Sequence, residues 1–455
     1  MIESEHIARL EAENAELAQQ VKMLGEKVAI LLKLLENKGV KKDSHNSHLP
    51  PSSDIGSKKN QSLREPSERN SGGQPGHSGS SLEMRAVADK IIELKSEYCG
   101  RCGSQLSEGE YVLQARRQVI EIPPMAPITE EYRQYGCRCH NCGEVQMAEF
   151  PGNVKAPIQY GSSVSAMVGY LSVYQYVPYY RLKKIFTDVF KMPLSEGSIS
   201  NMLEKAAGKA EFVYEAIKAE IGTSKVVGAD ETGAKVNGQK WWMWVWQNAL
   251  NTFMKASQNR GSQTVEEVWS AGLPEAVLVS DRWAAQLKTK SRGNQLCLAH
   301  LLRDVIYLKE SENHEFSEKF EKYLKEVFQA KREIVKNQQA FERENEVAQS
   351  LENRLNELLA LSICEEKYGE TAKFQRAMLK HRNSLLPCLY EVEIPADNNG
   401  SERAIRNIKV KQKISGQFKS GQKSFCILRS VIDTLLKRQL DVLPYLTQIM
   451  KIQPE

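Results

Sequence analysis

Three acidic residues stand where their carboxylates could act together. Asp230 ends the apolar run 225–230, Asp281 ends the run 276–281, and Glu402 follows a turn-like segment and opens a predicted helix. An ionised carboxylate avoids a dry environment unless it is paired or binds a metal ion. Carboxylate oxygens are ligands that Mg²⁺ accepts, and two such ions side by side support phosphodiester cleavage and joining. We therefore expect these three acids to share two Mg²⁺ ions, for which Mn²⁺ could substitute.

The alternative is that each acid is ordinary. Asp230 and Asp281 would then be turn residues, and Glu402 a helix-start residue favoured by the helix dipole. The predicted elements argue for convergence instead. They are strands over 226–230, 240–246, 252–257 and 277–280, and helices over 262–271 and from 294 onward. A three-strand meander, then a helix and a parallel strand, is the order of an RNase-H-like α/β core.

Two further polar residues share one face of the predicted helix after the second acid. His300 and Arg303 stand three residues apart, so both are candidates for holding a scissile phosphate. A histidine packed in the protein is the alternative. Cys297 and His300 have the Cys-x2-His spacing of some metal sites, but the sequence offers no second pair of ligands to complete such a site.

The densest basic stretch follows the third acid. Its candidate DNA-binding residues are Arg403, Arg406, Lys409, Lys411, Lys413 and Lys419. A DNA backbone near the metal ions would need such positive cover, and the segment 416–421 is expected to form a loop over the site. A solvated polar face is the alternative.

Five of the nine cysteines lie within 99–142, which indicates metal binding more than disulfides. Two C-x2-C-G pairs, Cys99 with Cys102 and Cys139 with Cys142, have the spacing of zinc knuckles. We expect them to hold one structural Zn²⁺ in a small zinc-ribbon β domain with strands near 117–122 and 128–133.

The N-terminal segment carries a heptad repeat that predicts a parallel coiled coil. Its two seams are Leu10, Leu17, Leu24 and Leu31, and Ile7, Asn14, Val21, Val28 and Leu35. We expect a homodimer or larger assembly through this segment. An amphipathic helix that packs on its own domain is the alternative.

At 455 residues the chain is expected to be multidomain. We expect a coiled coil (1–36), a flexible linker (37–95), a zinc-binding domain (96–150), a helical block (151–222), the first part of the core (223–300), an all-helical insertion (301–394), the second part of the core (395–440) and a C-terminal helix or tail (441–455). The capped helix that follows Ser195 is typical of helix-turn-helix units, or of plain packing on the core.

Bulk properties narrow the class of protein further. The net charge of +5 is too small to establish nucleic-acid binding, so local basic patches must carry that inference. No window approaches the ~20 apolar residues of a membrane span, and the N-terminus lacks a signal-peptide pattern. We expect a cytoplasmic protein without a membrane partner.

Several motifs together resemble one family. The chain is similar to the IS66 family of bacterial DDE transposases in its segment S-H-N-S-H-L-P-P-S-S-D, its two cysteine pairs, and the blocks A-D-E-T-G, V-S-D-R-W, C-L-A-H-L-L-R and D-N-N-G-S-E-R-A-I-R. The resemblance implies that Asp230, Asp281 and Glu402 form the catalytic triad and that a helical insertion separates the last two. One departure is that Ala-Ala-Gln follows Trp283, where the family commonly has a tyrosine.

The resemblance also implies a function. It implies a nucleoid-associated bacterial protein that binds double-stranded element ends with inverted repeats, binds target DNA, and works with small accessory proteins. The expected reaction is Mg²⁺-dependent strand cleavage and strand transfer. The alternatives are an RNase-H-like nuclease without strand transfer and a non-catalytic DNA-binding regulator.

Overall fold

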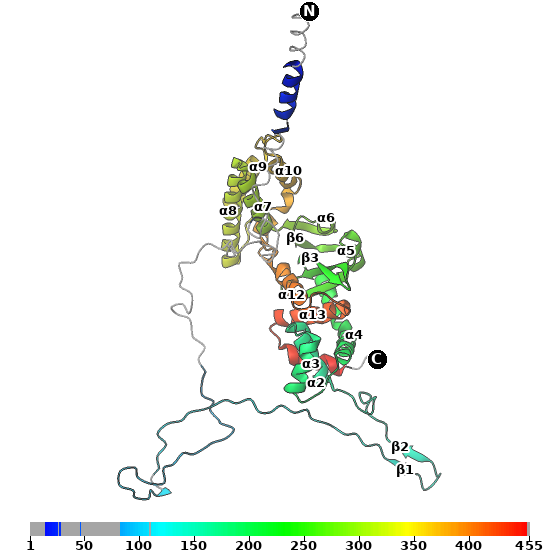
Figure 1. Cartoon of the computed structure of the whole chain (residues 1–455). Helices are drawn as coiled ribbons and strands as arrows, with labels where there is room; N and C mark the ends of the chain where they lie inside the picture. The colour runs from blue at the N-terminus through cyan, green and yellow to red at the C-terminus, as the bar shows by residue number, and fades with distance from the viewer. Residues whose placement is uncertain (1–13, 26, 29–45, 47–81, 109–110, 453–455) are drawn as a thin grey trace, which may run out of the picture.

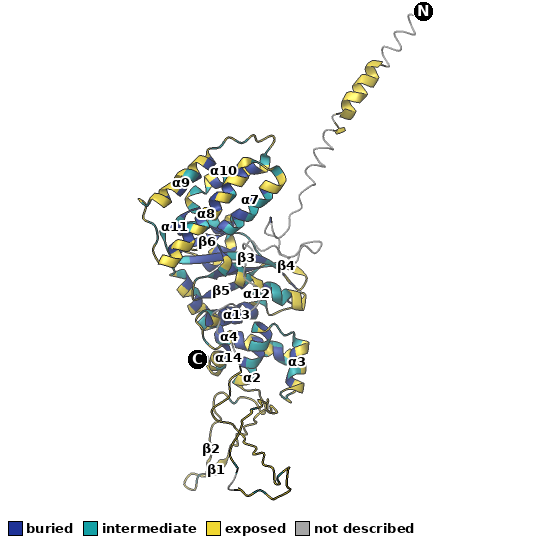
Figure 2. Ribbon diagram, turned by 90° about the vertical axis from the view of Figure 1, so that its left-hand side faces the viewer, coloured by how far each residue is buried: buried dark blue, intermediate teal, exposed yellow. Residues whose placement is uncertain are grey.

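The computed structural model describes residues 14–25, 27–28, 46, 82–108 and 111–452. A central sheet lies in the middle of an elongated molecule, as Figure 1 shows. The helices α7, α8, α9 and α10 lie at one end of the sheet, and α2, α3, α4 and α13 lie at the other. Figure 2 shows that the buried residues concentrate in the sheet and in the helices packed on it.

The central sheet has five strands in the order β5-β4-β3-β6-β7. They are β3 (Val226–Val236), β4 (Gln239–Gln247), β5 (Thr252–Ser257), β6 (Leu273–Ser280) and β7 (Ser291–Leu296). The first three form an antiparallel meander, and β6 and β7 run parallel to β3. Asn237 and Gly238, both with positive φ, make the tight turn between β3 and β4, as Asn-Gly pairs favour.

The sequence predicted this meander followed by a helix and a parallel strand, and the structure confirms it. The strand at 252–257 has its expected bounds, and β6 ends at Ser280, directly before Asp281. The expectation that Asp230 ends its strand is wrong. Asp230 lies inside β3, which continues to Val236 because β4 pairs with it from Gly228 to Val236.

The prediction of a helix from residue 294 is also wrong. Residues 291–296 form β7, and the helix begins only at Leu298. The segment has no apolar run, so its strand character is set by tertiary contacts. The fully buried Gln295 side chain donates to the carbonyls of Leu296 and Leu385 and accepts from the backbone N–H of Cys388.

Helices from distant parts of the chain complete the first hydrophobic core. They are α2 (Ser162–Gly169), the π-helix η3 (Tyr170–Tyr174), α3 (Tyr179–Asp188), α4 (Glu196–Gly222), α5 (Ser262–Val268), α6 (Ala284–Leu287), α12 (Asn399–Ser415), α13 (Gln422–Lys437) and α14 (Val442–Lys451). Ser195 caps α4 as predicted, since its hydroxyl accepts from the N–H of Ser198 at 2.9 Å. The buried residues of α4 belong to the same core as the sheet, which agrees with the packing alternative.

A second core lies under the segment between Asp281 and Glu402. Its helices are α7 (Leu298–Glu312), α8 (Glu315–Asn337), α9 (Glu346–Leu359), α10 (Gly369–Lys380), the 3-10 turn η4 (Arg382–Ser384) and α11 (Pro387–Tyr390). Phe316, Phe320 and Phe374 pack together inside it, and Val277 and Val279 of β6 join the same cluster. The predicted helical character of this segment is confirmed, and its core contacts one face of the sheet.

The N-terminal predictions fall only partly on described residues. Residues 14–25 are helical, and the seam residues Leu17, Val21, Leu24 and Val28 are all exposed. The other predicted seam positions (Ile7, Leu10, Leu31 and Leu35) and most of the linker 37–95 lie outside the described residues. Within the parts of the chain that the structure describes, none of the helices is both long and apolar enough to cross a membrane.

The predicted strands at 117–122 and 128–133 are not strands in the structure. Apolar side chains of both segments, among them Val119 and Ile128, are exposed, so no packing partner draws the segments into a sheet. The strands of this region are β1 (Gly136–Arg138) and β2 (Val145–Met147), which pair around the second cysteine knuckle.

Candidate active site

The register of the parallel strands brings Asp230 and Asp281 to the same level of the sheet. Gly228 of β3 pairs with Val279 of β6. Asp230 stands two residues beyond Gly228 in β3, and Asp281 directly follows Ser280, the last residue of β6, so the two acids lie at the same level of the sheet. This is the carboxyl end of β6, where ligands bind in open α/β sheets.

The start of α12 is fixed closely over this part of the sheet. The side chain of Asn398 donates to the carbonyl of Ala229 at 2.8 Å, and its backbone N–H donates to the Cys297 sulfur at 3.2 Å. A methyl group at Gly228 would lie 2.7 Å from Ser401 Oγ and 2.9 Å from Asn398 Oδ1. This close approach requires glycine in β3, and it holds the first turn of α12, which bears Glu402, against the strand that bears Asp230.

Electrostatics show that the three acids are neighbours. The pKa of the Asp230 carboxyl is raised well above its ordinary value, first by burial and then by the negative charges of Asp281, Glu231 and Glu402. The backbone N–H of Glu231 donates to Asp230 at 2.8 Å and offsets part of this rise. A bound cation would therefore stabilise the ionised form of the Asp230 carboxyl.

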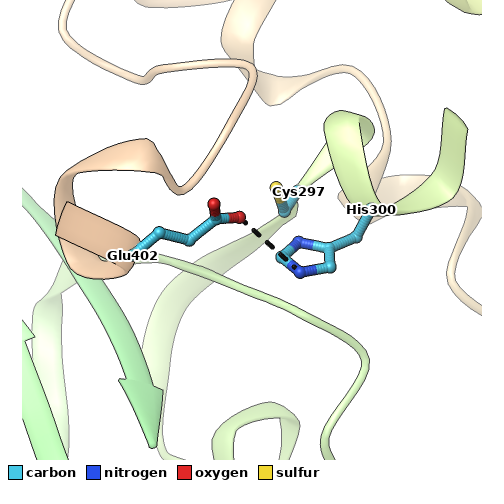
Figure 3. Close-up of side chains that lie close together, drawn as sticks. All are labelled: Cys297, His300 and Glu402. Atoms are coloured by element: carbon cyan, nitrogen blue, oxygen red, sulfur yellow. Dashed lines mark ion pairs between the residues drawn. The ribbon is translucent and has the colours of Figure 1, made fainter. Parts of the chain in front are cut away.

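Glu402 faces two residues of the first turns of α7. Its Oε1 lies 3.6 Å from His300 Nε2 and 3.7 Å from Arg303 Nη1. Figure 3 shows Glu402 and His300 pointing toward one another, with the Cys297 side chain beside them. The structure therefore brings both predicted auxiliary residues to the third acid. The same oxygen is buried and accepts no hydrogen bond from the residues that the structure describes.

A second carboxylate beside Asp230 was missed by the sequence analysis. Glu231 points to the opposite face of β3, with its side chain 1% exposed, and its Oε1 lies 2.9 Å from Arg260 Nη2. The Arg260 guanidinium stacks 3.7 Å from the ring centroid of Trp283 and 4.4 Å from that of Trp242. Trp283 in turn donates its backbone N–H to Asp281 at 2.8 Å. The cluster thus links the buried Glu231 to the position of Asp281.

Of the three acids, Asp281 lines an open cavity of about 470 Å³. The core contributes Arg260, Asp281 and Trp283 to its wall, and the helical segment contributes His300 and Asp304, among others. Arg282, which also lines the cavity, pairs with Asp304. Solvent and a ligand can therefore reach Asp281 from between the sheet and the helical segment.

The predicted DNA-binding residues divide into two groups. Arg403, Arg406, Lys413 and Lys419 are exposed. Lys409 instead donates to the carbonyl of Gly233 at 2.9 Å, and Lys411 lies 5.9 Å from the centroid of the Tyr179 ring. Burial lowers the pKa of both lysines. Their ammonium groups are engaged with the protein itself.

The segment 416–421 does not cover the acids, contrary to the prediction. Phe418 is buried and exchanges backbone hydrogen bonds with Lys235 and Asn237, which fixes the segment at the far end of β3. Six residues of strand separate Val236 from Asp230, which is about 20 Å.

The donor set of the three acids fits a hard divalent cation. The oxygens of the three acids do not all lie within 4.8 Å of one another, but Asp230 is destabilised by its acidic neighbours, and one oxygen of Glu402 accepts no hydrogen bond from the described residues. These are properties of an oxygen-ligand site for Mg²⁺ or Mn²⁺. Asp230, Asp281 and Glu402 are the residues that would hold such ions.

The two cysteine knuckles have the same local structure. In the first knuckle the backbone N–H of Cys99 donates to the carbonyl of Ser104 at 2.8 Å, and that of Gly103 donates to the carbonyl of Cys99 at 2.9 Å. In the second knuckle Cys139 donates to Glu144 and Gly143 donates to Cys139 at the same two distances. Gly103 and Gly143 have φ of 74° and 75°, which glycine adopts without strain. A hydrogen bond with Ser104 lowers the pKa of the Cys102 thiol to about 7. Each knuckle is thus shaped for metal, although the structure does not gather the four thiols into one group.

Comparison with known proteins identifies one family. The profile of a family described as "Transposase IS66 family" matches residues 157–424, which is more than half of the chain. The match covers α2 to α12, the start of α13 and all three acids. No curated protein matches the chain.

Proposed function

Because the chain belongs to the IS66 family of transposases, we propose that it binds the ends of an insertion element and cuts and joins DNA there. Asp230, Asp281 and Glu402 are the catalytic residues of this proposal, on an RNase-H-like core. The family match supports a transposase-type function, and the assignment to these residues is our own.

The shared register of β3 and β6 is the observation that carries the proposal. Asp230 and Asp281 each stand two residues beyond the Gly228–Val279 pair, which supports a shared role for the two acids. The helix start that bears Glu402 is hydrogen-bonded to the same strand through Asn398. Acids separated by more than 100 residues along the chain, as Glu402 is from Asp281, have no structural need to meet in this way.

The reaction we propose has two steps. Water attacks the phosphodiester at the element end, a bond forms from the water oxygen to phosphorus, and the bond from phosphorus to the 3′-oxygen breaks. The 3′-hydroxyl so freed then attacks a target strand, forms a new phosphodiester and displaces the target's own 3′-oxygen. When bound, divalent ions would neutralise charge on the attacking and leaving oxygens.

The residues of the chain position these groups. Asn398 and Gly228 hold Glu402 over the sheet, and Trp283 orients Asp281 through its backbone N–H. His300 and Arg303, at 3.6 and 3.7 Å from Glu402, restrain that carboxylate and present N–H donors to the scissile phosphate.

The exposed cations of α12 extend this site along a DNA backbone. Arg406 stands four residues after Glu402 and Lys413 eleven residues after it, so the three side chains line one stripe of the helix. Two exposed cations on the stripe that begins at the third acid suit contacts with consecutive phosphates.

Outside the matched residues, we propose that the two knuckles hold one structural Zn²⁺ and that the N-terminal helix pairs with a second copy. The exposed seam residues Leu17, Val21 and Leu24 support pairing, because an apolar stripe of this kind is otherwise left in water.

The proposal is tested by nicking of element-end DNA with Mg²⁺. Asp230→Asn, Asp281→Asn and Glu402→Gln should each abolish nicking, with DNA binding retained. Asp188→Asn, which removes an exposed carboxylate from α3, should nick as wild type does. If the three variants cut as fast as wild type, the catalytic assignment is wrong. A wild-type protein that binds ends without ever cutting would instead be a regulator.

A further inference from the structure

One group of unlike metal ligands lies next to the proposed catalytic acids. Within the described part of the chain, the ligand atoms of Cys297, His300 and Glu402 all lie within 4.8 Å of one another. Figure 3 shows the three side chains converging from two elements, with Cys297 and His300 on one side and Glu402 on the other. From this geometry we propose that the group binds Zn²⁺ or a similar borderline-soft cation, and that this ion withdraws Glu402 from the magnesium site.

The donor set selects the ion. One thiolate, one imidazole and one carboxylate suit Zn²⁺ and Co²⁺, whereas Mg²⁺ prefers oxygen ligands alone. Zinc bonds are about 2.3 Å to sulfur and about 2.0–2.2 Å to nitrogen and oxygen, so donors arranged tetrahedrally lie about 3.3–3.7 Å apart. His300 Nε2 and Glu402 Oε1 are already separated by 3.6 Å.

The backbone holds the ligands in this arrangement. Cys297 stands between β7 and α7, where its N–H donates to Ser280 and its sulfur accepts from the N–H of Asn398. His300 lies one helical turn later, and its N–H donates to the Cys297 carbonyl. Glu402 lies in the first turn of α12, which the same Asn398 residue precedes. Small side-chain rotations therefore suffice to close the group on an ion.

Two observations favour occupation by a cation. Glu402 Oε1 is buried and, among the described residues, no group donates a hydrogen bond to it. Cys297 and His300 both line the 470 Å³ cavity, which gives an ion a route from solvent and leaves room for a water as fourth ligand. Arg303, 3.7 Å from the same oxygen, must turn away when the ion binds, and its long side chain permits this.

The consequence for activity rests on the proposed function. Because Glu402 belongs to both ligand sets, Zn²⁺ at Cys297 and His300 competes with Mg²⁺ at Asp230 and Asp281. Binding requires that the Cys297 thiol lose its proton to solvent, and coordination to the ion must drive this loss because burial raises the pKa of the thiol to about 12. The expected effect is inhibition of DNA cleavage by Zn²⁺ that added Mg²⁺ relieves.

Binding is measured on the full-length protein with Co²⁺, whose thiolate complexes absorb light by charge transfer. The four knuckle cysteines also bind Co²⁺, so the comparison is between variants that all retain them. Cys297→Ser keeps an acceptor for Asn398 but should bind about one Co²⁺ fewer per chain than wild type. Cys426→Ser, which changes another buried thiol remote from the group, should match wild type. His300→Ala provides a second loss variant at a half-buried position if Cys297→Ser fails to fold.

The inference is overturned if wild type and both loss variants bind equal numbers of Co²⁺. In the nicking assay, Zn²⁺ should inhibit wild type about tenfold or more and Cys297→Ser less than about twofold, both at one Mg²⁺ concentration. Equal inhibition of the two proteins would refute the competition for Glu402. Failure of the proposed function has a different signature, because wild type would then not nick with Mg²⁺ at all while the Co²⁺ count would still differ.

Discussion

Replacing Gly228 with alanine should damage both stability and activity, because α12 leaves no room for a methyl group there. That group would lie 2.5 Å from Gln247 Nε2, 2.7 Å from Ser401 Oγ and 2.9 Å from Asn398 Oδ1. Ser401 and Asn398 are themselves buried, so they cannot simply turn into solvent. Something in the contact between β3 and α12 must shift.

The size of the effect follows from two contributions. Overpacking of a well-filled interior costs about 1–3 kcal/mol. Loss of the hydrogen bond from Asn398 to the Ala229 carbonyl adds about 1 kcal/mol, which gives a total of about 2–4 kcal/mol. If the protein relaxes by moving the start of α12 about 1 Å, Glu402 moves with it, and a displacement of that size costs about 100-fold in rate.

Urea unfolding and the nicking assay measure these two effects. Gly208→Ala is the matched control, because Gly208 is exposed within α4 and a methyl group there meets nothing within 4 Å. Alanine favours helix, so this control should raise the free energy of unfolding by about 0.5–1 kcal/mol. A Gly228→Ala protein with the stability and nicking rate of wild type would refute the close placement of α12 on β3.

Three other substitutions probe separate parts of the structure. Arg260→Ala leaves Glu231 buried without its cation and should lower the free energy of unfolding by about 2–3 kcal/mol. This is less than the loss expected for a fully buried ion pair, because the Arg260 side chain is 38% exposed. An unchanged urea midpoint would contradict this prediction. Burial lowers the pKa of Lys437 to about 8 in the folded protein. Between about pH 8 and pH 10.4 the unfolded chain therefore binds more protons than the folded one, and the free energy of unfolding should rise by about 3 kcal/mol across that range. The rise should be missing in Lys437→Met. Arg406→Ala should weaken DNA binding and reduce the slope of the logarithm of the binding constant against the logarithm of the salt concentration by about 1, whereas Lys409→Ala should mainly lower stability. Equal slopes for Arg406→Ala and wild type in titrations at several salt concentrations would argue against the phosphate contact.

The sequence was most informative where local pattern and tertiary environment agree. The strand 252–257, the position of Asp281 directly after an apolar strand, and the Ser195 cap all follow from short-range rules. Each depends on residues close together in the chain, so a single sequence contains the needed information.

Prediction failed where long-range contacts decide the structure. The sequence 291–296 reads as polar and forms a strand only because Gln295 finds buried backbone partners in the segment 385–388. The segment 416–421 was placed over the acids from its proximity to Glu402, but buried Phe418 fixes it to the other end of β3.

Glu231 was overlooked for a related reason. Ending the first strand at Asp230 removed the alternation that sends the next side chain to the opposite face, where Arg260 and Trp283 meet it. A strand extended to Val236 would have shown that adjacent acids point to opposite sides. The grouping of Cys297 with Glu402 had no signal beyond the Cys-x2-His spacing, since the third ligand lies 102 residues from His300 in the sequence.

Anomalous diffraction from a crystal of the protein with Mn²⁺ and element-end DNA would locate the catalytic metal ions. We expect two peaks about 3.5–4 Å apart, with Asp230 within bonding distance of both and Asp281 and Glu402 each bound to one. Strong Mn²⁺ peaks elsewhere in the crystal, with none in contact with Asp230, would contradict this expectation.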